Sequence, residues 1–327
     1  MNTQLIKSKA FVLALFFCLC SNETLVKASP LSKFTRLTNG PILSPGPNHF
    51  DESGAFNPAS IKYNHKIVLL YRAQDKKGVS TIGYADSKDG INFVKATAPV
   101  FTPKTSYETG GGIEDPRLVK INNQFYLTYT GYNKQDAQLC LARSTDLKHW
   151  QRLGIILPAY KGTWNKQWTK SGAILTKKIK GKYWMYYLGT RNGCDEMGLA
   201  SSTDLLHWQD ATPEPVLPKR DKQFDARVVE PGSPPIITKQ GILLIYNGAD
   251  KNLVYRTGYA IFDVNDPRKL ILRSAHPIFV PLASWEKNGQ VPNVVFIEGL
   301  VKTKNNLLLY YGGADKYTGV VYTKLKP

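Results

Sequence analysis

A short apolar run that ends in tyrosine occurs five times along this chain, at nearly constant spacing. The runs read VLLY, YLTY, WMYY, LLIY and LLYY, and their last residues are Tyr71, Tyr129, Tyr187, Tyr246 and Tyr311. The intervals between these tyrosines are 58, 58, 59 and 65 residues. A regular period of this length indicates a fold built from repeated supersecondary units, so it limits the fold more than any single segment does.

Each period contains further short elements of β type. A strand and a polar turn follow the tyrosine run in ADSKDGINF (85–93), ARSTDLKHW (142–150) and ASSTDLLHW (200–208). Another short strand precedes the run and ends in a turn rich in Lys, Asn and Gly. About four short strands per period are typical of a propeller blade, so the sequence predicts an all-β, five-bladed β-propeller. A β-sandwich is the alternative, but it does not account for the period.

The first residues of the chain differ from the rest. Two lysines precede an apolar run at 10–20, and a small-residue site follows at Ala28. This pattern is typical of a secretory signal peptide, and the run is shorter than the roughly 20 residues that span a bilayer. We therefore expect a signal peptide over 1–28, a single propeller domain over 29–327, and a secreted or periplasmic protein with no stable membrane insertion after cleavage. An uncleaved anchor is the alternative.

The chain is strongly basic. Its formal net charge is +18, and it falls to +16 without residues 1–28, which hold three lysines and one glutamate. Such a charge favours anionic partners. The lysines are spread along the sequence, however, and no nucleic-acid-binding motif is present. We expect a solvated basic surface and no nucleic-acid partner, and we leave open whether this surface binds an acidic glycan.

Polar residues recur at one position of each period, 13 to 16 residues before the aligned tyrosine. These positions hold Asn57, Asp115, Ser171, Glu230 and Glu298. The first strand of a propeller blade borders the central channel, so these side chains are expected to face one axis. Three carboxyl groups around one pit can differ in pKa, which suits a pair of acid and base.

A structural role is the alternative for these charged residues. Glu114 or Asp115 would then form a stabilising ion pair with Arg117. Likewise, Arg72 and Arg227 would pair with the acids rather than contact a ligand.

Several motifs together resemble glycoside hydrolase family 130, a family of five-bladed propellers that act on β-mannosides. The resemblance extends from about residue 34 to the C-terminus. It rests on NPA (57–59), YRA (71–73), GGIEDPR (111–117), EPGSPP (230–235), VPNVVF (291–296) and GGAD (312–315).

The resemblance implies roles for individual residues. Asp115 in the Glu-Asp-Pro-Arg motif corresponds to the general acid, and Arg117 to a residue that orients it. In the phosphorylases this acid is thought to act through a sugar hydroxyl that relays the proton. By the same resemblance, Asn57, Arg72 and Asp315 would hold the mannose in the cleavage subsite.

The family contains inverting phosphorylases and inverting hydrolases, which differ in the attacking group. Glu230 and Glu298 resemble carboxylates that activate water in the hydrolases, whereas Lys170 resembles a lysine of the phosphate site in the phosphorylases. A carboxylate repels phosphate but can serve as a base toward water. We therefore expect an exported inverting hydrolase of β-1,2- or β-1,4-linked mannosides, with Glu114 and Arg227 completing the substrate site.

Three alternatives remain for the function. The first is a β-mannoside phosphorylase that uses inorganic phosphate and releases mannose 1-phosphate. The second is a propeller that binds an oligosaccharide or glycan without cleaving it, and the third is an arabinan-type glycosidase. No metal and no organic cofactor are expected, because protonation of the leaving group and attack by water need neither.

Overall fold

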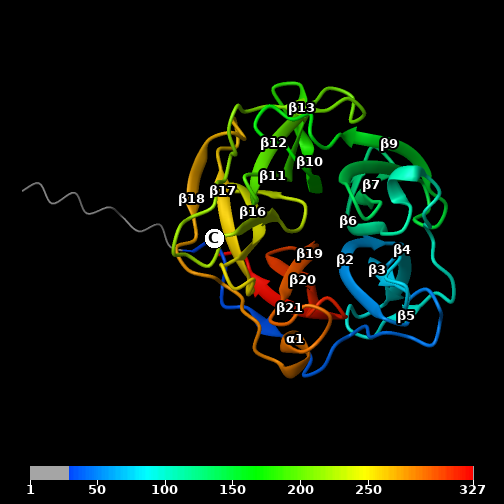
Figure 1. Cartoon of the computed structure of the whole chain (residues 1–327). Coiled ribbons are helices and arrows are strands. Elements are labelled where there is room, and N and C mark those ends of the chain that lie inside the picture. Colours follow the sequence, from blue (N-terminus) through cyan, green and yellow to red (C-terminus); the bar gives the residue numbers. More distant parts are fainter. Residues whose placement is uncertain (1–28, 327) are drawn as a thin grey trace, which may run out of the picture.

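A computed structural model describes residues 29–326, which form β-strands with only two short helical turns (Figure 1). The expected signal peptide over 1–28 therefore lies outside the described residues. Within 29–326 there is no helix with the length and apolar character that crossing a membrane requires. The prediction of an all-β chain is confirmed.

The elements follow one another along the chain in a simple order. They are β1 (Thr35–Arg36), β2 (Gly54–Tyr63), β3 (Lys66–Gln74), β4 (Ser80–Ser87), β5 (Val94–Lys95), the 3-10 turn η1 (Ser106–Glu108), β6 (Gly112–Ile121), β7 (Gln124–Tyr132), β8 (Ala137–Ser144), β9 (Gln151–Leu157), β10 (Thr169–Ile179), β11 (Lys182–Arg191), β12 (Cys194–Ser202), β13 (Gln209–Asp210), β14 (Val228–Pro231), β15 (Ile236–Thr238), β16 (Gly241–Ala249), β17 (Tyr255–Phe262), β18 (Leu270–Arg273), the helix α1 (Ser284–Lys287), β19 (Val295–Thr303), β20 (Asn306–Gly313) and β21 (Tyr317–Lys324).

Antiparallel pairing groups these strands into five units that match the five sequence periods. Unit 1 is β2 to β5, unit 2 is β6 to β9, unit 3 is β10 to β13, unit 4 is β14 to β18, and unit 5 is β19 to β21 with β1. Single parallel bridges join unit 1 to unit 2 and unit 3 to unit 4. The described strands thus form three sheets, and none of these sheets closes on itself.

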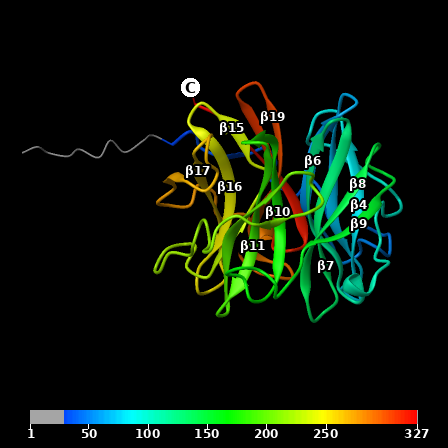
Figure 2. The same cartoon turned by 90° about the horizontal axis from the view of Figure 1, so that it is seen from above.

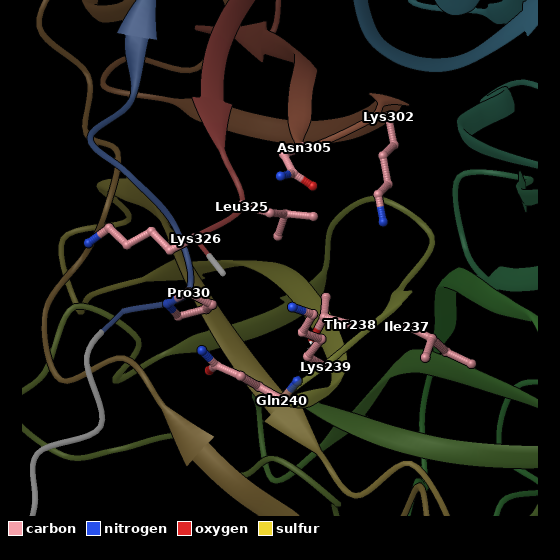
Figure 3. A pocket seen from close by; sticks show the side chains of 9 residues that line it. All are labelled: Pro30, Ile237, Thr238, Lys239, Gln240, Lys302, Asn305, Leu325 and Lys326. Atoms are coloured by element: carbon pink, nitrogen blue, oxygen red, sulfur yellow. Dashed lines mark hydrogen bonds between the residues drawn. The ribbon is translucent and has the colours of Figure 1, made fainter.

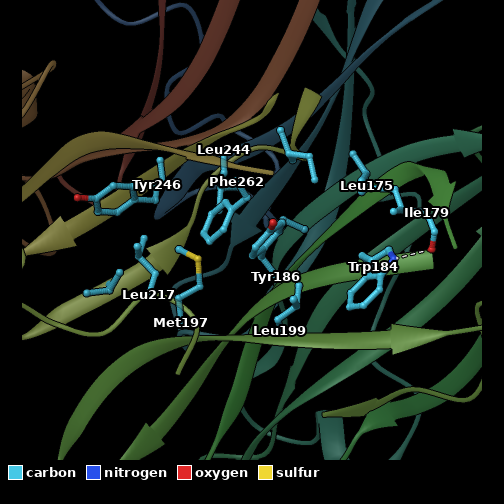
Figure 4. Packing of buried hydrophobic residues seen from close by; sticks show 14 of the residues in the cluster. Leu175, Ile179, Trp184, Tyr186, Met197, Leu199, Leu217, Leu244, Tyr246 and Phe262 are labelled. Carbon is cyan, nitrogen blue, oxygen red and sulfur yellow. Dashed lines mark hydrogen bonds between the residues drawn. The ribbon is translucent and has the colours of Figure 1, made fainter. Parts of the chain in front are cut away.

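The hydrophobic core lies between consecutive units. Each of five buried clusters draws its residues mainly from two neighbouring units, and one of them joins unit 5 to unit 1. Figure 4 shows the cluster between units 3 and 4, where Tyr186, Tyr246 and Phe262 meet. Because both faces of a unit are covered, the middle strand β16 is buried along its whole length. Figure 2 shows the units from a second direction, standing side by side.

All five aligned tyrosines use their hydroxyl group in the same way. Each hydroxyl donates a hydrogen bond to a carboxylate at the periphery of its unit: Tyr71 to Asp51 (3.2 Å), Tyr129 to Glu108 (2.9 Å), Tyr187 to Asp210 (2.5 Å), Tyr246 to Asp225 (2.7 Å) and Tyr311 to Glu286 (2.7 Å). In four units this carboxylate also pairs with a cation from the fourth strand, namely Lys95, Arg152, Arg273 and Arg36. We call this arrangement the tyrosine–carboxylate–cation triad.

In unit 3 the carboxylate that binds the aligned tyrosine comes from the fourth strand. Asp210 of β13 pairs with Ala200, and Arg152 of β9 pairs with Ala142 at the matching position of unit 2. The fourth strand of unit 3 therefore supplies the carboxylate where the other units supply a cation. The hydroxyl of Tyr187 keeps an anionic acceptor, although the acceptor comes from a different segment.

The tyrosine ring reaches its carboxylate by crossing the third strand of its unit. Gly83 and Gly319 lie opposite Tyr71 and Tyr311 in the register. A Cβ atom at Gly83 would lie 2.3 Å from Cζ of Tyr71, and one at Gly319 would lie 2.4 Å from Cζ of Tyr311. These positions therefore need a residue without a side chain because the ring occupies that space.

The triad of unit 2 predicts unequal losses of stability. Arg152→Met should lower the free energy of unfolding by about 3–5 kcal/mol, since it leaves the buried carboxylate of Glu108 without its cation. Tyr129→Phe should cost only about 1 kcal/mol, because it removes one hydrogen bond. Equilibrium denaturation of both variants measures the difference, and equal losses would contradict the importance of the ion pair.

Candidate active site

Units 1 to 3 share a bulge near the start of their first strand. The strands β2, β6 and β10 each shift register there, and the residues at the shift are Asn57, Asp115 and Ser171. Their φ angles are 46°, 49° and 58°, in the left-handed region that non-glycine residues seldom adopt. A bulge redirects the side chain of the extra residue, and so these three polar residues occupy equivalent places in neighbouring units.

Asp115 has one occupied and one open carboxylate oxygen. Its Oδ1 accepts hydrogen bonds from Asn57 Nδ2 at 2.9 Å and from Arg72 Nη1 at 3.2 Å. Its Oδ2 lies 3.9 Å from Lys170 Nζ and accepts no hydrogen bond from the described residues. The side chain of Asp115 is nearly buried. The first oxygen is therefore held by the protein, and the second is left for a ligand.

Arg72 joins two carboxylates of the neighbouring unit. Its Nη2 donates to Glu114 Oε1 at 2.6 Å, and its Nη1 binds Asp115. Its Nε donates to Ser80 Oγ at 2.9 Å, which fixes the plane of the guanidinium group. The two partners and the fixed plane make Arg72 a link between units 1 and 2 at the site.

Arg117 lies behind Asp115, where its side chain is only 1% exposed. It donates to the backbone carbonyls of Asp115, Pro231 and Gly232, at 3.0, 2.7 and 3.2 Å. Its Nη1 is also 3.0 Å from Glu298 Oε1. Arg117 thus holds the backbone of Asp115 against unit 4, which agrees with the orienting role implied by the sequence. Its burial favours this orienting role over direct contact with a ligand.

Glu298 is completely buried, and among residues 29–326 its one ion-pair partner is Arg117. The geometry of this pair does not make a hydrogen bond, so neither carboxylate oxygen accepts one from the described residues. Burial raises the pKa of Glu298 well above its ordinary value, although the charge of Arg117 opposes the rise. The surroundings of Glu298 therefore increase its affinity for a proton.

Glu230 and Lys170 occupy equivalent register positions in units 4 and 3. Glu230 accepts a short hydrogen bond from the hydroxyl of Ser171. Burial raises the pKa of Glu230, against the lowering effect of Lys170. Burial also opposes the charge of Lys170, but Asp115 and Glu230 raise the pKa of this lysine, so it remains a cation. The site therefore contains an ammonium group between two carboxyl groups.

The carboxyl groups of the site differ in their affinity for a proton. Burial acts against the ionised form of Asp115, but Arg72, Lys170 and Arg117 outweigh it and lower the pKa of Asp115 to about 2. Burial raises the pKa of Asp315 to about 6, with Arg72 acting against the rise. Asp115 is therefore ionised in the unliganded site, and Asp315 changes its charge near neutral pH.

Most of the residues predicted for the site are brought together. Hydrogen bonds or ion pairs connect Asn57, Arg72, Glu114, Asp115, Arg117, Lys170 and Glu298, and the charge of Glu230 acts on Lys170. The side chain of Asp315 forms no hydrogen bond or ion pair with them in the described structure, but the charge of Arg72 affects its pKa. Arg227 is different, since its side chain makes no ion pair or hydrogen bond with this cluster in the described residues, and its buried Nη1 has no partner.

Two residues of the site were not among the predicted ligands. Ser171 binds Glu230, and its place in the sequence period already indicated that it lies at the site. Gly312 lies so close to Asn57 that an added Cβ would be 1.9 Å from Asn57 Oδ1. The motif GGAD contains this glycine, but the reason for it appears only once units 5 and 1 are packed together. Among residues 29–326, no group of His, Cys, Asp or Glu side chains is arranged to hold a metal ion.

Comparison with known proteins relates this site to carbohydrate-active enzymes. The profile of glycoside hydrolase family 130, described as beta-1,4-mannooligosaccharide phosphorylase, matches residues 38–326. A 1,2-beta-oligomannan phosphorylase of Thermoanaerobacter sp. (strain X514) is 38% identical over 90% of this chain and 98% of its own length. A beta-1,2-mannobiose phosphorylase of the same strain is 37% identical over 88% of this chain and 96% of its own.

Similarity to a solved structure supports the same family. Its description states that family 130 of mannoside phosphorylases contains glycoside hydrolases that target beta-1,2 mannosidic linkages in Candida mannan. Its TM-score is 0.82 at 36% identity, and the match covers 89% of this chain and 94% of that structure. Because the family profile spans nearly all of the described residues and the relatives match over almost their full length, this chain belongs to glycoside hydrolase family 130.

Proposed function

We propose that this chain is an inverting phosphorylase of β-1,2-linked mannosides that releases mannose 1-phosphate. The observation that carries the proposal is the state of Lys170. Arg72 and Arg117 are bound to protein acceptors, whereas the side chain of Lys170 is 24% exposed and its ammonium nitrogen lies 3.9 Å from the carboxylate of Asp115. It is therefore free to bind an anion, and the two Thermoanaerobacter relatives are β-1,2 phosphorylases.

The proposed reaction needs a proton on Asp115, which the unliganded site does not favour. Lys170 is one of the cations that lower the pKa of Asp115. A phosphate ion bound to Lys170 would neutralise this cation, and a sugar over Asp115 would exclude water. Both changes raise the pKa of a carboxyl group. Substrate binding would thus protonate Asp115, which then donates its proton toward the leaving oxygen, directly or through a sugar hydroxyl, while phosphate attacks the opposite face of the sugar.

Hydrolysis is the second candidate, and it was the expectation from the sequence. It is favoured by Glu230, whose charge acts on Lys170, and by Glu298, which pairs with Arg117. A carboxylate can activate water but repels phosphate. In this reaction Glu230 is the better base, since Glu298 is fully buried. The description of the structural relative, which reports β-1,2-specific hydrolases within the family, also supports this candidate.

We also propose that the five units are the blades of a five-bladed propeller. Support comes from the five buried clusters, which connect each unit to the next and unit 5 to unit 1. The pairing of β1 with β21 further ties the start of the described chain to its end. In such a ring the bulged first strands line the axis, where a sugar would bind.

Export remains part of the proposal, and it rests on the sequence of residues 1–28 alone. The enzyme would then act on mannosides outside the cytoplasm. The expected substrate is an oligosaccharide or glycan, with inorganic phosphate as the second substrate.

Product analysis distinguishes the two candidate reactions. Purified protein is incubated with β-1,2- and β-1,4-mannobiose, with and without inorganic phosphate, and the products are separated by anion-exchange chromatography. We expect mannose 1-phosphate from the β-1,2 substrate only when phosphate is present. Free mannose formed without phosphate would instead establish hydrolysis, and a bound but uncleaved sugar would establish a binding protein.

A lysine variant tests the proposed phosphate site. Lys170→Met should raise the KM for phosphate much more than the KM for the mannoside, because it removes the ammonium group that binds the anion. Lys120→Met changes an exposed lysine at the other end of the first strand of unit 2 and serves as the control. Equal changes in both KM values would contradict a phosphate-binding role for Lys170.

A second variant tests the general acid. Asp115→Asn should lower kcat by about 10²–10⁴-fold, because the amide cannot protonate the leaving group. The same substitution at Asp86, which pairs with Lys66 on the outside of unit 1, should leave kcat unchanged. Circular dichroism would check that both variants fold, and full activity of folded Asp115→Asn would exclude the proposed mechanism.

A further inference from the structure

The hairpins that join the first and second strands carry lysines but no acidic residue. There is one such hairpin in each unit, and the five together hold ten lysines: Lys62, Lys66, Lys120, Lys177, Lys178, Lys180, Lys182, Lys239, Lys302 and Lys304. The sequence spreads these lysines over more than two hundred positions. The fold collects them, because the same turn of each unit lies at the same end of the antiparallel strands. We call this end the basic face.

The lysines of the basic face are largely free of ion pairs. Nine of the ten have exposed side chains, and Lys66 is the partly buried one. Lys66 pairs with Asp86 at 2.7 Å. The other nine form no ion pair with a carboxylate among residues 29–326. Their positive charges are therefore available to attract an anionic partner to this end of the molecule.

The basic face lies at the opposite end of the first strands from the candidate active site. Asp115 is near the start of β6, and Lys120 is near its end. The acidic side chains of the hairpins between third and fourth strands reach the same end, but they are engaged locally. For example, Asp146 and Asp204 accept hydrogen bonds from the backbone and the histidine of their own turns. A partner on this face would leave the active site open.

The chain enters the described domain at the basic face. The backbone N–H of Lys326 donates to the carbonyl of Pro30 at 2.8 Å. Pro30 and Lys326 line one pocket with Lys239 and Lys302 (Figure 3). Residues 1–28, with the apolar run at 10–20, precede this point in the sequence. After cleavage of the expected signal peptide, the mature chain would therefore begin beside these lysines.

We propose that the basic face is a docking surface for a membrane that contains anionic phospholipids. The charges are ammonium groups on long flexible stems, spread over five hairpins, which suits an extended layer of phosphate headgroups more than one shaped ligand. A soluble acidic glycan, which would follow one groove or strip of the surface, is the competing occupant that the experiment below distinguishes. Docking in this orientation turns the active site toward the solution, where the mannoside is met.

Vesicle sedimentation with charge-reversal variants tests this inference. The variant Lys62→Glu, Lys177→Glu, Lys239→Glu, Lys302→Glu changes one lysine in each of four hairpins. The control Lys77→Glu, Lys134→Glu, Lys161→Glu, Lys251→Glu changes four exposed lysines outside these hairpins by the same net charge. Both variants keep the full chain, so the apolar segment contributes equally to each. Vesicles are made of phosphatidylcholine alone or mixed with phosphatidylglycerol.

We expect the unchanged protein to bind the phosphatidylglycerol vesicles, and to bind them less at high salt, where charges are screened. The first variant should bind about a hundredfold more weakly, since each lysine at an anionic surface contributes substantially to binding, while the control stays within a few-fold of the unchanged protein. Equal losses in both variants would overturn the proposal. So would binding of a soluble polyuronate without binding of the vesicles. Unchanged turnover of a soluble mannobiose by the first variant would verify its fold.

Discussion

The tyrosine–carboxylate–cation triad is the interaction on which the geometry of four of the five units depends, and unit 3 keeps its tyrosine–carboxylate part. It links three segments at once: the second strand through the tyrosine, the loop before the first strand through the carboxylate, and the fourth strand through the cation. In unit 2 the carboxylate is Glu108, which ends the turn just before β6. The start of β6 is therefore fixed from outside, and Asp115 lies close to that start. A buried carboxylate with its tyrosine and its arginine has little freedom to shift, because any loss of partner leaves a charge without compensation.

Contacts on both sides of Asp115 explain how an unfavourable backbone conformation can persist at the site. Asn57, Asp115 and Ser171 occupy the left-handed region, which costs roughly 1–2 kcal/mol for a residue with a side chain. Such strain is retained when the surrounding structure determines it. Here Arg117 binds the carbonyl of Asp115 from one side, and Arg72 and Asn57 bind its carboxylate from the other. The strained conformation thus directs three polar side chains toward one place without relying on a flexible loop.

The period of the tyrosines was sufficient to predict the all-β units and the place of Asp115, because side-chain packing repeats with the units. The partners of the tyrosines could not be predicted, since their carboxylates lie in loops of different length and unit 3 takes its carboxylate from the fourth strand. The sequence also did not reveal that the side chain of Arg227 forms no ion pair or hydrogen bond with the cluster in the described residues. The ionised state of Asp115 was also hidden, because it depends on Arg72, Lys170 and Arg117, which belong to three different units.

The distribution of lysines shows a further limit of the linear sequence. Read along the chain, they indicated only a diffuse basic surface. In the fold, the lysines of the hairpins gather at one end of the strands, whereas Lys170 is the one lysine that forms an ion pair with the carboxylates of the site among residues 29–326. A carboxyl-rich site repels anions, so phosphate can enter only where a cation is free to receive it. The charge of the hairpins is too far along the strands to supply that cation. In the proposed reaction, Lys170 and the protonation of Glu230 would therefore decide between phosphate and water, and the overall basic charge of the chain would not.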